Sequence, residues 1–525
     1  MDSQNEHKFY LFLLIASAAV LCFFGLETSG LTSGDETRVA GISAEMYLEG
    51  NYIVPKLNDK PFLEYPGLFY YFQSFCYHIF GINAFAAKLP SAIAAFASGI
   101  LLFFFGRRLN FTPRAAFLSS IFLLTGAQFW ANAHIGMVDS LLAFFVLLAV
   151  FGFHRFIEGK NTWGLLCYTL GIAGGIMTKG MIGFILPTAV LGSYLVGRDI
   201  LEKKFRILPY LCLGTGILAG FLPWGVWAVL LYQAEGWNAF HTVFWVNNFG
   251  RFLGSQGDHL EPFYYYLEKL PGLFQPWLIL LPFAVWHAVG NIRREKAKNS
   301  LFLLCAIVTP FLLLMFSSSK RQVYLLPLYA FPALLCGTWV DFCCSVEMFR
   351  KCLNYLQLIL LVLLPIAGLG LCFFATPQTL VYPLLPLFFI TPAILVFKTG
   401  KARFTLLVFG FVSFYTALYA TVLEQHNKKS CLKEMFQFVR EKEAEGYRTF
   451  LVSKSERTDG AAYFYLKKNI PNKLADKREI GQKELWIIRK RKGKFAHAFA
   501  DSHFVVTPAE YYKKVPQKAE GRNTP

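Results

Sequence analysis

The sequence predicts an all-α polytopic membrane protein with about thirteen transmembrane helices and a small C-terminal α/β domain. Of its 525 residues, 55% are hydrophobic, 16% are charged and 55 are Phe, more apolar surface than a soluble domain needs. Long apolar stretches recur along the chain, and most of them can cross the ~30 Å of hydrocarbon in a bilayer.

The first apolar stretch, residues 9–26, follows a short polar segment. It lacks a small-residue cleavage site and many further stretches come after it, so we expect a retained helix and not a signal peptide. The stretch 163–197 is divided into two spans at Thr178-Lys179-Gly180. The other expected spans are 85–105, 115–133, 138–157, 208–231, 273–291, 301–316, 322–340, 353–375, 379–397 and 404–423.

Lys and Arg placement predicts the orientation of these spans. The connectors rich in Lys and Arg all fall on the side of the N-terminus when the spans are counted: 106–114, 198–206, 292–299 and 398–403. Such an excess marks the cytoplasmic side. The N-terminus is therefore predicted to be cytoplasmic, and the loops 27–84 and 232–272 lie outside, together with the chain after residue 424.

The composition divides the chain into a membrane domain, residues 1–424, and a second domain, residues 425–525, where charge rises and Phe falls. The second domain is predicted to hold helices at 431–445 and 461–466 and strands at 447–452, 485–488 and 504–506. Within the outer loop, 40–48 and 68–80 also have helical spacing.

The net charge is +18, and residues 426–525 carry 23 Lys and Arg against 12 Asp and Glu. An extracytoplasmic tail argues against nucleic acid as a partner. Membrane lipid headgroups or a phosphorylated substrate fit better, and simple solubility is an equal alternative.

Charged and polar side chains from separate parts of the membrane domain fall on its predicted outer side. Carboxylates near lipid are costly, so they usually face a cavity or the water interface and often do chemistry. An enzyme acting on a charged lipid needs this mixture, whereas a pore or a scaffold does not. The clusters are Asp35-Glu36 with Arg38; Lys60 to Pro66, with Glu64; His134 and Asp139; Lys179; His241 to Glu261, with Arg251 and His259; and Lys320-Arg321 with Tyr324.

A transfer from a lipid phosphate would use both signs of charge. Fixed cations bind the phosphate, at ~1.5–3 kcal/mol for each charge-assisted hydrogen bond, and stabilise it as it departs. A carboxylate can remove the proton of an attacking sugar hydroxyl. Each residue also has a simpler interpretation. Asp35 and Glu36 could be solvated loop charges, Asp139 a helix cap, and Lys179 an ammonium that snorkels to the interface.

Lys320 and Arg321 could likewise be interfacial anchors. Glu64 and His259 have the chemistry of metal ligands, or they could be solvated side chains. No cofactor is predicted, and a divalent metal stays an open option.

In these motifs the chain resembles the bacterial branch of the protein O-mannosyltransferase superfamily, type-C glycosyltransferases that use polyprenyl-phosphate sugars. Within it, the resemblance is closest to the aminoarabinose transferases that modify lipid A. The matching stretches lie between about residues 30 and 340 and include Asp35-Glu36-Thr37-Arg38, Lys60-Pro61-Phe62-Leu63-Glu64-Tyr65-Pro66, Met137-Val138-Asp139, Thr178-Lys179-Gly180, Asn248 to Phe252 and Ser319-Lys320-Arg321-Gln322-Val323-Tyr324-Leu325-Leu326-Pro327.

The resemblance implies an outer cavity, an essential first-loop aspartate at Asp35 and a donor-phosphate arginine at Arg251. A second aspartate of the family corresponds to Asp139, and the tyrosine of its Lys-Arg…Tyr motif corresponds to Tyr324. One position departs from the family, which has Glu-Lys-Pro-Pro where this chain has Glu64-Tyr65-Pro66-Gly67. The missing lysine would contact the phosphate, and Lys60 or Lys179 could replace it.

We therefore predict a glycosyltransferase of the bacterial inner membrane with a periplasmic site, which uses an undecaprenyl-phosphate sugar. Asp35 is the expected base, assisted by Asp139 and Glu36, and the phosphate is held by Arg251, Lys60, Lys179, Lys320, Arg321 and Tyr324. Lipid A is the leading acceptor, with a protein hydroxyl or an envelope glycan as alternatives. A lipid or sugar transporter would place charges at mid-membrane on broken helices, and a polymerase or ligase would use a lipid-diphosphate donor.

Overall fold

The computed structural model describes residues 3–508, apart from 29, 32–33, 160, 251–259, 296, 386–399, 425–431, 452–455, 472–482, 490–498 and 501–503. The chain divides into two compact units. Unit 1 holds Met1–Leu26, Leu63–Phe69 and Lys88–Val422, and unit 2 holds Glu27–Phe62, Tyr70–Ala87 and Leu423–Pro525.

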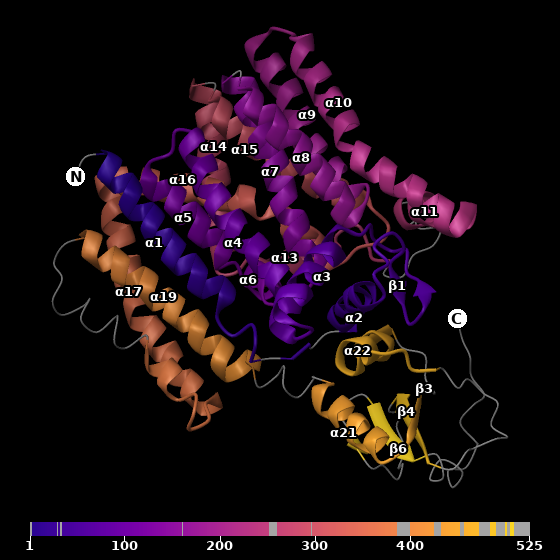
Figure 1. Ribbon diagram of the computed structural model, residues 1–525. Helices are drawn as coiled ribbons and strands as arrows, with labels where there is room; N and C mark the ends of the chain where they lie inside the picture. The colour runs from indigo at the N-terminus through magenta and orange to yellow at the C-terminus, as the bar shows by residue number, and fades with distance from the viewer. Residues whose placement is uncertain are drawn as a thin grey trace. The chain divides into compact units, whose positions relative to one another are not determined.

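Unit 1 is made of helices, and the first and last of its long helices, α1 and α19, lie side by side (Figure 1). In chain order its helices are α1 (Ser3–Phe23), α4 (Ala84–Arg108), α5 (Pro113–Leu124), α6 (Ala127–Ala133), α7 (Val138–Gly159), α8 (Thr162–Lys179), α9 (Ile182–Glu202), α10 (Ile207–Gly220), α11 (Leu222–His241), η1 (Thr242–Gly250), α13 (Tyr265–Leu273), η2 (Trp277–Leu280), α14 (Leu281–Glu295), α15 (Lys298–Phe316), η3 (Gln322–Leu328), α16 (Ala330–Ser345), α17 (Glu347–Leu371), η4 (Cys372–Phe374), α19 (Gly400–Leu418) and η5 (Tyr419–Leu423).

The expected spans fall on these helices, except that 379–397 lies largely outside the described residues. Six described helices are long and apolar enough to cross a membrane, and eight spans result if each of two bent pairs counts as one. The bends are 111° between α13 and the helix after it and 53° between η3 and α16. The count of about thirteen stays a prediction.

The predicted division at Thr178-Lys179-Gly180 is confirmed. Gly180 ends α8 with φ 71°, in the left-handed region that glycine adopts without steric penalty. Before this break α8 packs closely on α7. A Cβ at Gly152 would lie 2.5 Å from the Tyr168 nitrogen, and one at Gly171 would lie 2.5 Å from the Ala149 nitrogen. Small residues of this kind let membrane helices approach closely.

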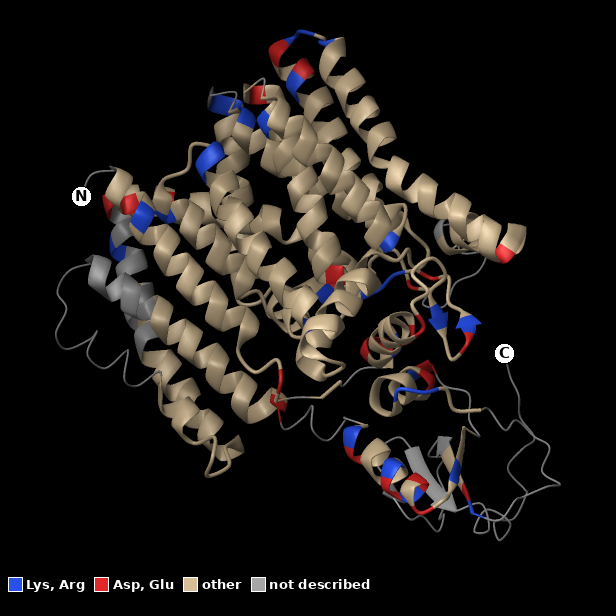
Figure 2. Cartoon of the chain, in the orientation of Figure 1, with Lys and Arg blue, Asp and Glu red and all other residues tan. Residues whose placement is uncertain are grey.

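Charged residues of unit 1 gather at the ends of the long helices, whose middles are mostly uncharged (Figure 2). This distribution is the one expected of helices that cross a bilayer.

Unit 2 joins part of the first outer loop to the C-terminal segment. The loop contributes α2 (Gly34–Glu49), the two-stranded ribbon of β1 (Lys56–Leu57) and β2 (Lys60–Pro61), and most of α3 (Leu68–Phe80). The helices expected at 40–48 and 68–80 are therefore present. Helix α2 begins six residues before the expected position and is buried from Glu36 to Met46.

The C-terminal segment of unit 2 packs two helices on a mixed sheet. Helices α21 (Lys433–Ala444) and α22 (Glu456–Leu466) accompany strands in the order β3-β4-β6-β5. The strands are β3 (Arg448–Leu451), β4 (Glu484–Arg489), β5 (Phe499–Ala500) and β6 (Phe504–Pro508), with β3 parallel to β4 and the other pairs antiparallel.

Leu485 and Ile487 share one face of β4, where they join a core with residues of α21 and α22. The helices and strands expected after residue 425 are thus present, although α22 begins five residues before the expected position. The division into a membrane domain of residues 1–424 and a periplasmic α/β domain of residues 425–525 stays a prediction.

Candidate functional site

Two of the predicted site residues form a buried ion pair in unit 1. Asp139 is the second residue of α7, Lys179 is the last residue of α8, and the Lys179 ammonium donates to the Asp139 carboxylate. The two side chains are only 3% and 9% exposed, respectively. Lys179 is therefore not a surface lysine that snorkels to the interface, and Asp139 has a charged partner.

Two tyrosine rings complete the surroundings of this ion pair. The Lys179 Nζ lies 4.9 Å from the centroid of the Tyr324 ring and 5.6 Å from that of the Tyr65 ring. A cation near the face of an aromatic ring is attracted by the ring quadrupole. Helices α7 and α8, the 3-10 helix η3 and the segment after β2 thus bring together Asp139, Lys179, Tyr324 and Tyr65.

Tyr65 is the position at which the sequence departs from the aminoarabinose transferases. Its ring is buried and lies near Lys179, the side chain that the sequence offered as one replacement for the missing lysine. The departure was visible in the sequence, but the contact between the two side chains was not.

The expected base, Asp35, lies in unit 2 at the start of α2. Its side chain is 30% exposed and its carboxylate lies 3.2 Å from Arg38, one turn along the helix. The next residue, Glu36, is fully buried. Of these two predicted catalytic carboxylates, Asp35 is therefore the one that a substrate can reach. Asp35 and Asp139 belong to different units, and their predicted convergence stays a prediction.

Arg38 has two further partners in unit 2. Its Nη1 lies 2.5 Å from the Glu456 carboxylate of α22, and its guanidinium carbon lies 5.1 Å from the centroid of the Phe62 ring. A residue near the C-terminus therefore contributes to the surroundings of Asp35. Glu456 was not predicted as a site residue, because nothing in the local sequence distinguishes it from other surface carboxylates.

Lys320 is buried and holds two segments of backbone together. Its ammonium donates to the Ser317 carbonyl and, at 2.9 Å, to the Glu261 carbonyl. An isolated bridge between Leu260 and Ser319 joins the same two segments. Burial lowers the pKa of Lys320. These contacts give Lys320 a structural role in this turn, and its predicted contact with phosphate stays a prediction.

The remaining predicted residues are Lys60, Glu64, Arg321, Arg251 and His259. Lys60 is exposed on β2, and Glu64 and Arg321 are half-buried. Arg251 and His259 lie outside the described residues, so the donor contact and the pairing of His259 with Glu64 on a metal stay predictions.

A cluster of three carboxylates in unit 2 was not predicted. Oxygens of Glu45, Glu49 and Asp59 lie within 4.8 Å of one another. Glu45 accepts hydrogen bonds of 2.8 Å from the backbone nitrogens of Asn58 and Asp59, which fixes the turn between β1 and β2. Burial nevertheless raises the pKa of Glu45 to about 7. The cluster forms because this turn brings Asp59 back onto α2.

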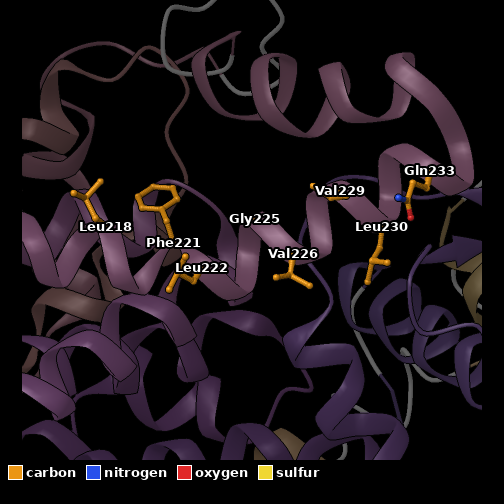
Figure 3. A pocket seen from close by; sticks show the side chains of 8 residues that line it. All are labelled: Leu218, Phe221, Leu222, Gly225, Val226, Val229, Leu230 and Gln233. Atoms are coloured by element: carbon orange, nitrogen blue, oxygen red, sulfur yellow. The ribbon is translucent and has the colours of Figure 1, made fainter.

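An open apolar groove of about 490 Å³ lies along α10 and α11 (Figure 3). Its lining residues are apolar apart from Gln233: Leu218, Phe221, Leu222, Gly225, Val226, Val229, Leu230 and Gln233. Such a groove suits a hydrocarbon chain and not the charged part of a substrate.

Comparisons with known proteins bear on this site. Residues 64–227 match the family model described as dolichyl-phosphate-mannose-protein mannosyltransferase. The undecaprenyl phosphate-alpha-4-amino-4-deoxy-L-arabinose arabinosyl transferase of Aeromonas hydrophila is 31% identical over 315 residues, which are 59% of this chain and 56% of that protein. Transferase 2 of the same description from Proteus mirabilis is 33% identical over 328 residues, 60% of this chain and 56% of that protein. The predicted resemblance is confirmed.

A solved structure shows the same fold. ArnT from Cupriavidus metallidurans, bound to undecaprenyl phosphate, superimposes with a TM-score of 0.75 at 18% identity, covering 95% of this chain and 97% of that one. With the apolar helices described above, this fold identifies a multi-pass membrane protein. In sequence, the chain matches little more than half the length of these two transferases.

Proposed function

We propose that this protein is a glycosyltransferase of the bacterial inner membrane. It transfers a sugar from undecaprenyl phosphate to an acceptor at the periplasmic face, and lipid A is the proposed acceptor. The observation that carries the proposal is the buried Asp139–Lys179 pair beside Tyr324, in a chain similar in sequence to undecaprenyl-phosphate aminoarabinose transferases.

In the proposed reaction an acceptor hydroxyl attacks the anomeric carbon of the donor sugar. A bond forms between the acceptor oxygen and that carbon, the bond from the carbon to the phosphate oxygen breaks, and the phosphate leaves with the electron pair. Asp35 takes the hydroxyl proton, a role that suits its partly exposed carboxylate and its fixed partner Arg38.

The cations hold the phosphate before and after the bond breaks. Before the donor binds, the Asp139 carboxylate balances the charge of the Lys179 ammonium. A buried ammonium without such a partner would be unfavourable. An arriving phosphate, with Arg251 as its main partner, could share this ammonium, and the Tyr324 hydroxyl could donate to a phosphate oxygen. The ring of Tyr65 takes the place of the family's lysine beside the site.

The proposed topology places the N-terminus in the cytoplasm and the C-terminal segment in the periplasm, with about thirteen spans. The basic connectors support this orientation, because all of them fall on the N-terminal side of the membrane when the spans are counted. Glu64 and His259 would be the ligands of a divalent metal, because both residue types coordinate such ions.

A protein hydroxyl is the second candidate acceptor. The family model that matches residues 64–227 is named for transfer to proteins, which favours this alternative over a transporter.

Mass spectrometry of lipid A, envelope glycans and envelope proteins separates these acceptors. We expect lipid A from cells that carry the gene to be heavier by one sugar residue than lipid A from cells without it. Asp35→Asn, expressed at the normal level, should abolish the shift. The exposed surface carboxylate Glu268 supplies the matched control Glu268→Gln, which should retain it. A shift on a protein instead would support the second candidate, and full transfer by Asp35→Asn would refute Asp35 as the base.

A further inference from the structure

Helix α22, in the C-terminal segment, runs along α2, the helix that carries Asp35. A Cβ added at Gly41 would lie 2.3 Å from the Gly460 Cα, and one added at Gly460 would lie 2.3 Å from the Thr37 carbonyl oxygen. These distances leave no room for a side chain at either position. The two backbones therefore touch, although more than 400 residues separate them in sequence.

In addition to this glycine crossing, ion pairs of Arg38 join the first turns of the two helices. Arg38 contacts Asp35 at 3.2 Å through Nη2 and Glu456 at 2.5 Å through Nη1. Its side chain is 9% exposed and lies over the Phe62 ring. The guanidinium forms an ion pair with each carboxylate, and its rigid planar geometry fixes the two relative to each other. The position of Arg38, and with it the orientation of Asp35, is thus shared with Glu456.

Further hydrogen bonds join α22 to the end of α2 and to the turn between β1 and β2. The Tyr463 hydroxyl donates to Glu49 at 3.0 Å and lies 3.4 Å from Asp59. The Asn58 amide donates to Asp459 at 3.3 Å. The Arg38–Glu456 and Glu49–Tyr463 contacts, with the glycine crossing between them, define the register of α22 against α2.

We propose that α22 positions the transfer site, and that Glu456 is a positioning residue which acts on Asp35 through Arg38. The inference rests on the proposed function, in which Asp35 is the base. It extends that function by giving the C-terminal segment a role in positioning Asp35.

The test compares Glu456→Gln with Glu456→Asp and with a control in the full-length protein. The Glu456 side chain is 57% exposed, so its replacement should leave the fold intact. The control is Glu443→Gln, which removes a carboxylate from a second ion pair of the C-terminal segment, with Lys468 at 2.8 Å. Transfer is measured with undecaprenyl phosphate-linked aminoarabinose as donor and lipid A as acceptor.

We expect Glu456→Gln to lower kcat about tenfold or more with the donor KM unchanged, because the base is misplaced while donor contacts remain. Glu456→Asp should recover part of kcat, and Glu443→Gln should behave as wild type. A normal kcat for Glu456→Gln, in a protein that Asp35→Asn inactivates, would overturn the inference alone. Full transfer by Asp35→Asn would instead refute the proposed function.

Hydrogen exchange provides a readout that does not depend on the substrates. We expect Glu456→Gln to accelerate exchange in the first turns of α2 several-fold and Glu443→Gln to leave it unchanged. Equal exchange in both variants would contradict the proposed coupling whether or not transfer is detected.

Discussion

The Asp139–Lys179 pair gives the sharpest prediction about stability. Replacing Lys179 with Met removes the ammonium and leaves the Asp139 carboxylate, whose side chain is 3% exposed, without its charged partner. Removing one partner of a buried ion pair costs about 3–5 kcal/mol, because the remaining charge is poorly solvated. The contacts of the ammonium with Tyr65 and Tyr324 are lost as well, which adds ~1 kcal/mol.

The double variant Asp139→Asn with Lys179→Met should be more stable than Lys179→Met alone. It has no buried charge, and replacing both partners of a buried pair by neutral side chains is often nearly neutral. We therefore expect the melting temperatures to fall in the order wild type, double variant, single variant.

The assay is thermal unfolding of the purified proteins in one detergent at one scan rate, because membrane proteins of this size often unfold irreversibly. The control is Lys269→Met, which breaks the exposed pair with Glu268 and should cost less than about 1 kcal/mol. A Lys179→Met variant as stable as Lys269→Met, or a double variant no more stable than the single one, would refute the buried-pair account.

Three further predictions follow from single sites. Tyr65→Lys, which restores the family's residue, should place a second ammonium near Lys179 and lower the melting temperature by several degrees, whereas Tyr65→Phe should not; equal stability of the two variants would argue against the ring contact. Burial favours the protonated form of Glu45 in the folded state, so its contribution to stability is greatest below pH 4.5 and is lost as the pH rises through about 7. After correction for the intrinsic rate, hydrogen exchange around the β1–β2 turn should therefore be faster at pH 8 than at pH 5. The free energy of opening this turn should be lower at pH 8 by on the order of 1–2 kcal/mol, and Glu45→Gln should remove the difference. Lys320→Met leaves two backbone carbonyls without their donor and should destabilise the protein by about 1–3 kcal/mol in the same thermal assay; an unchanged melting temperature would contradict the structural role of this lysine.

The positions of the helices could be predicted from the sequence, because a run of apolar residues identifies a span without knowledge of its neighbours. Their breaks could not always be predicted. The expected span 115–133 is two helices, α5 and α6, which end and begin on either side of Thr125 and Gly126. The Thr125 hydroxyl accepts a hydrogen bond from Trp277, and its carbonyl accepts one from Tyr415. These partners are 152 and 290 residues away, so the local sequence does not predict them.

The pairing of residues in the candidate site could not be predicted from the sequence either. Asp139 and Lys179 stand out in the sequence because each is a charge beside an apolar run, but their pairing depends on how α7 packs on α8. Arg38 was part of a recognised motif, whereas its partner Glu456 lies 418 residues further on. Sequence patterns therefore singled out charged residues of the first outer loop, and tertiary packing determined which side chains contact them.

In the proposed reaction this protein transfers a sugar from undecaprenyl phosphate with Asp35 as the base. The most direct measurement reconstitutes the purified full-length protein in vesicles that contain lipid A and radiolabelled undecaprenyl phosphate-linked aminoarabinose. We expect label to appear in lipid A as undecaprenyl phosphate is released, and Asp35→Asn should stop both. A donor that stays intact with the wild-type protein, or an Asp35→Asn variant that transfers label at the wild-type rate, would contradict the proposed reaction.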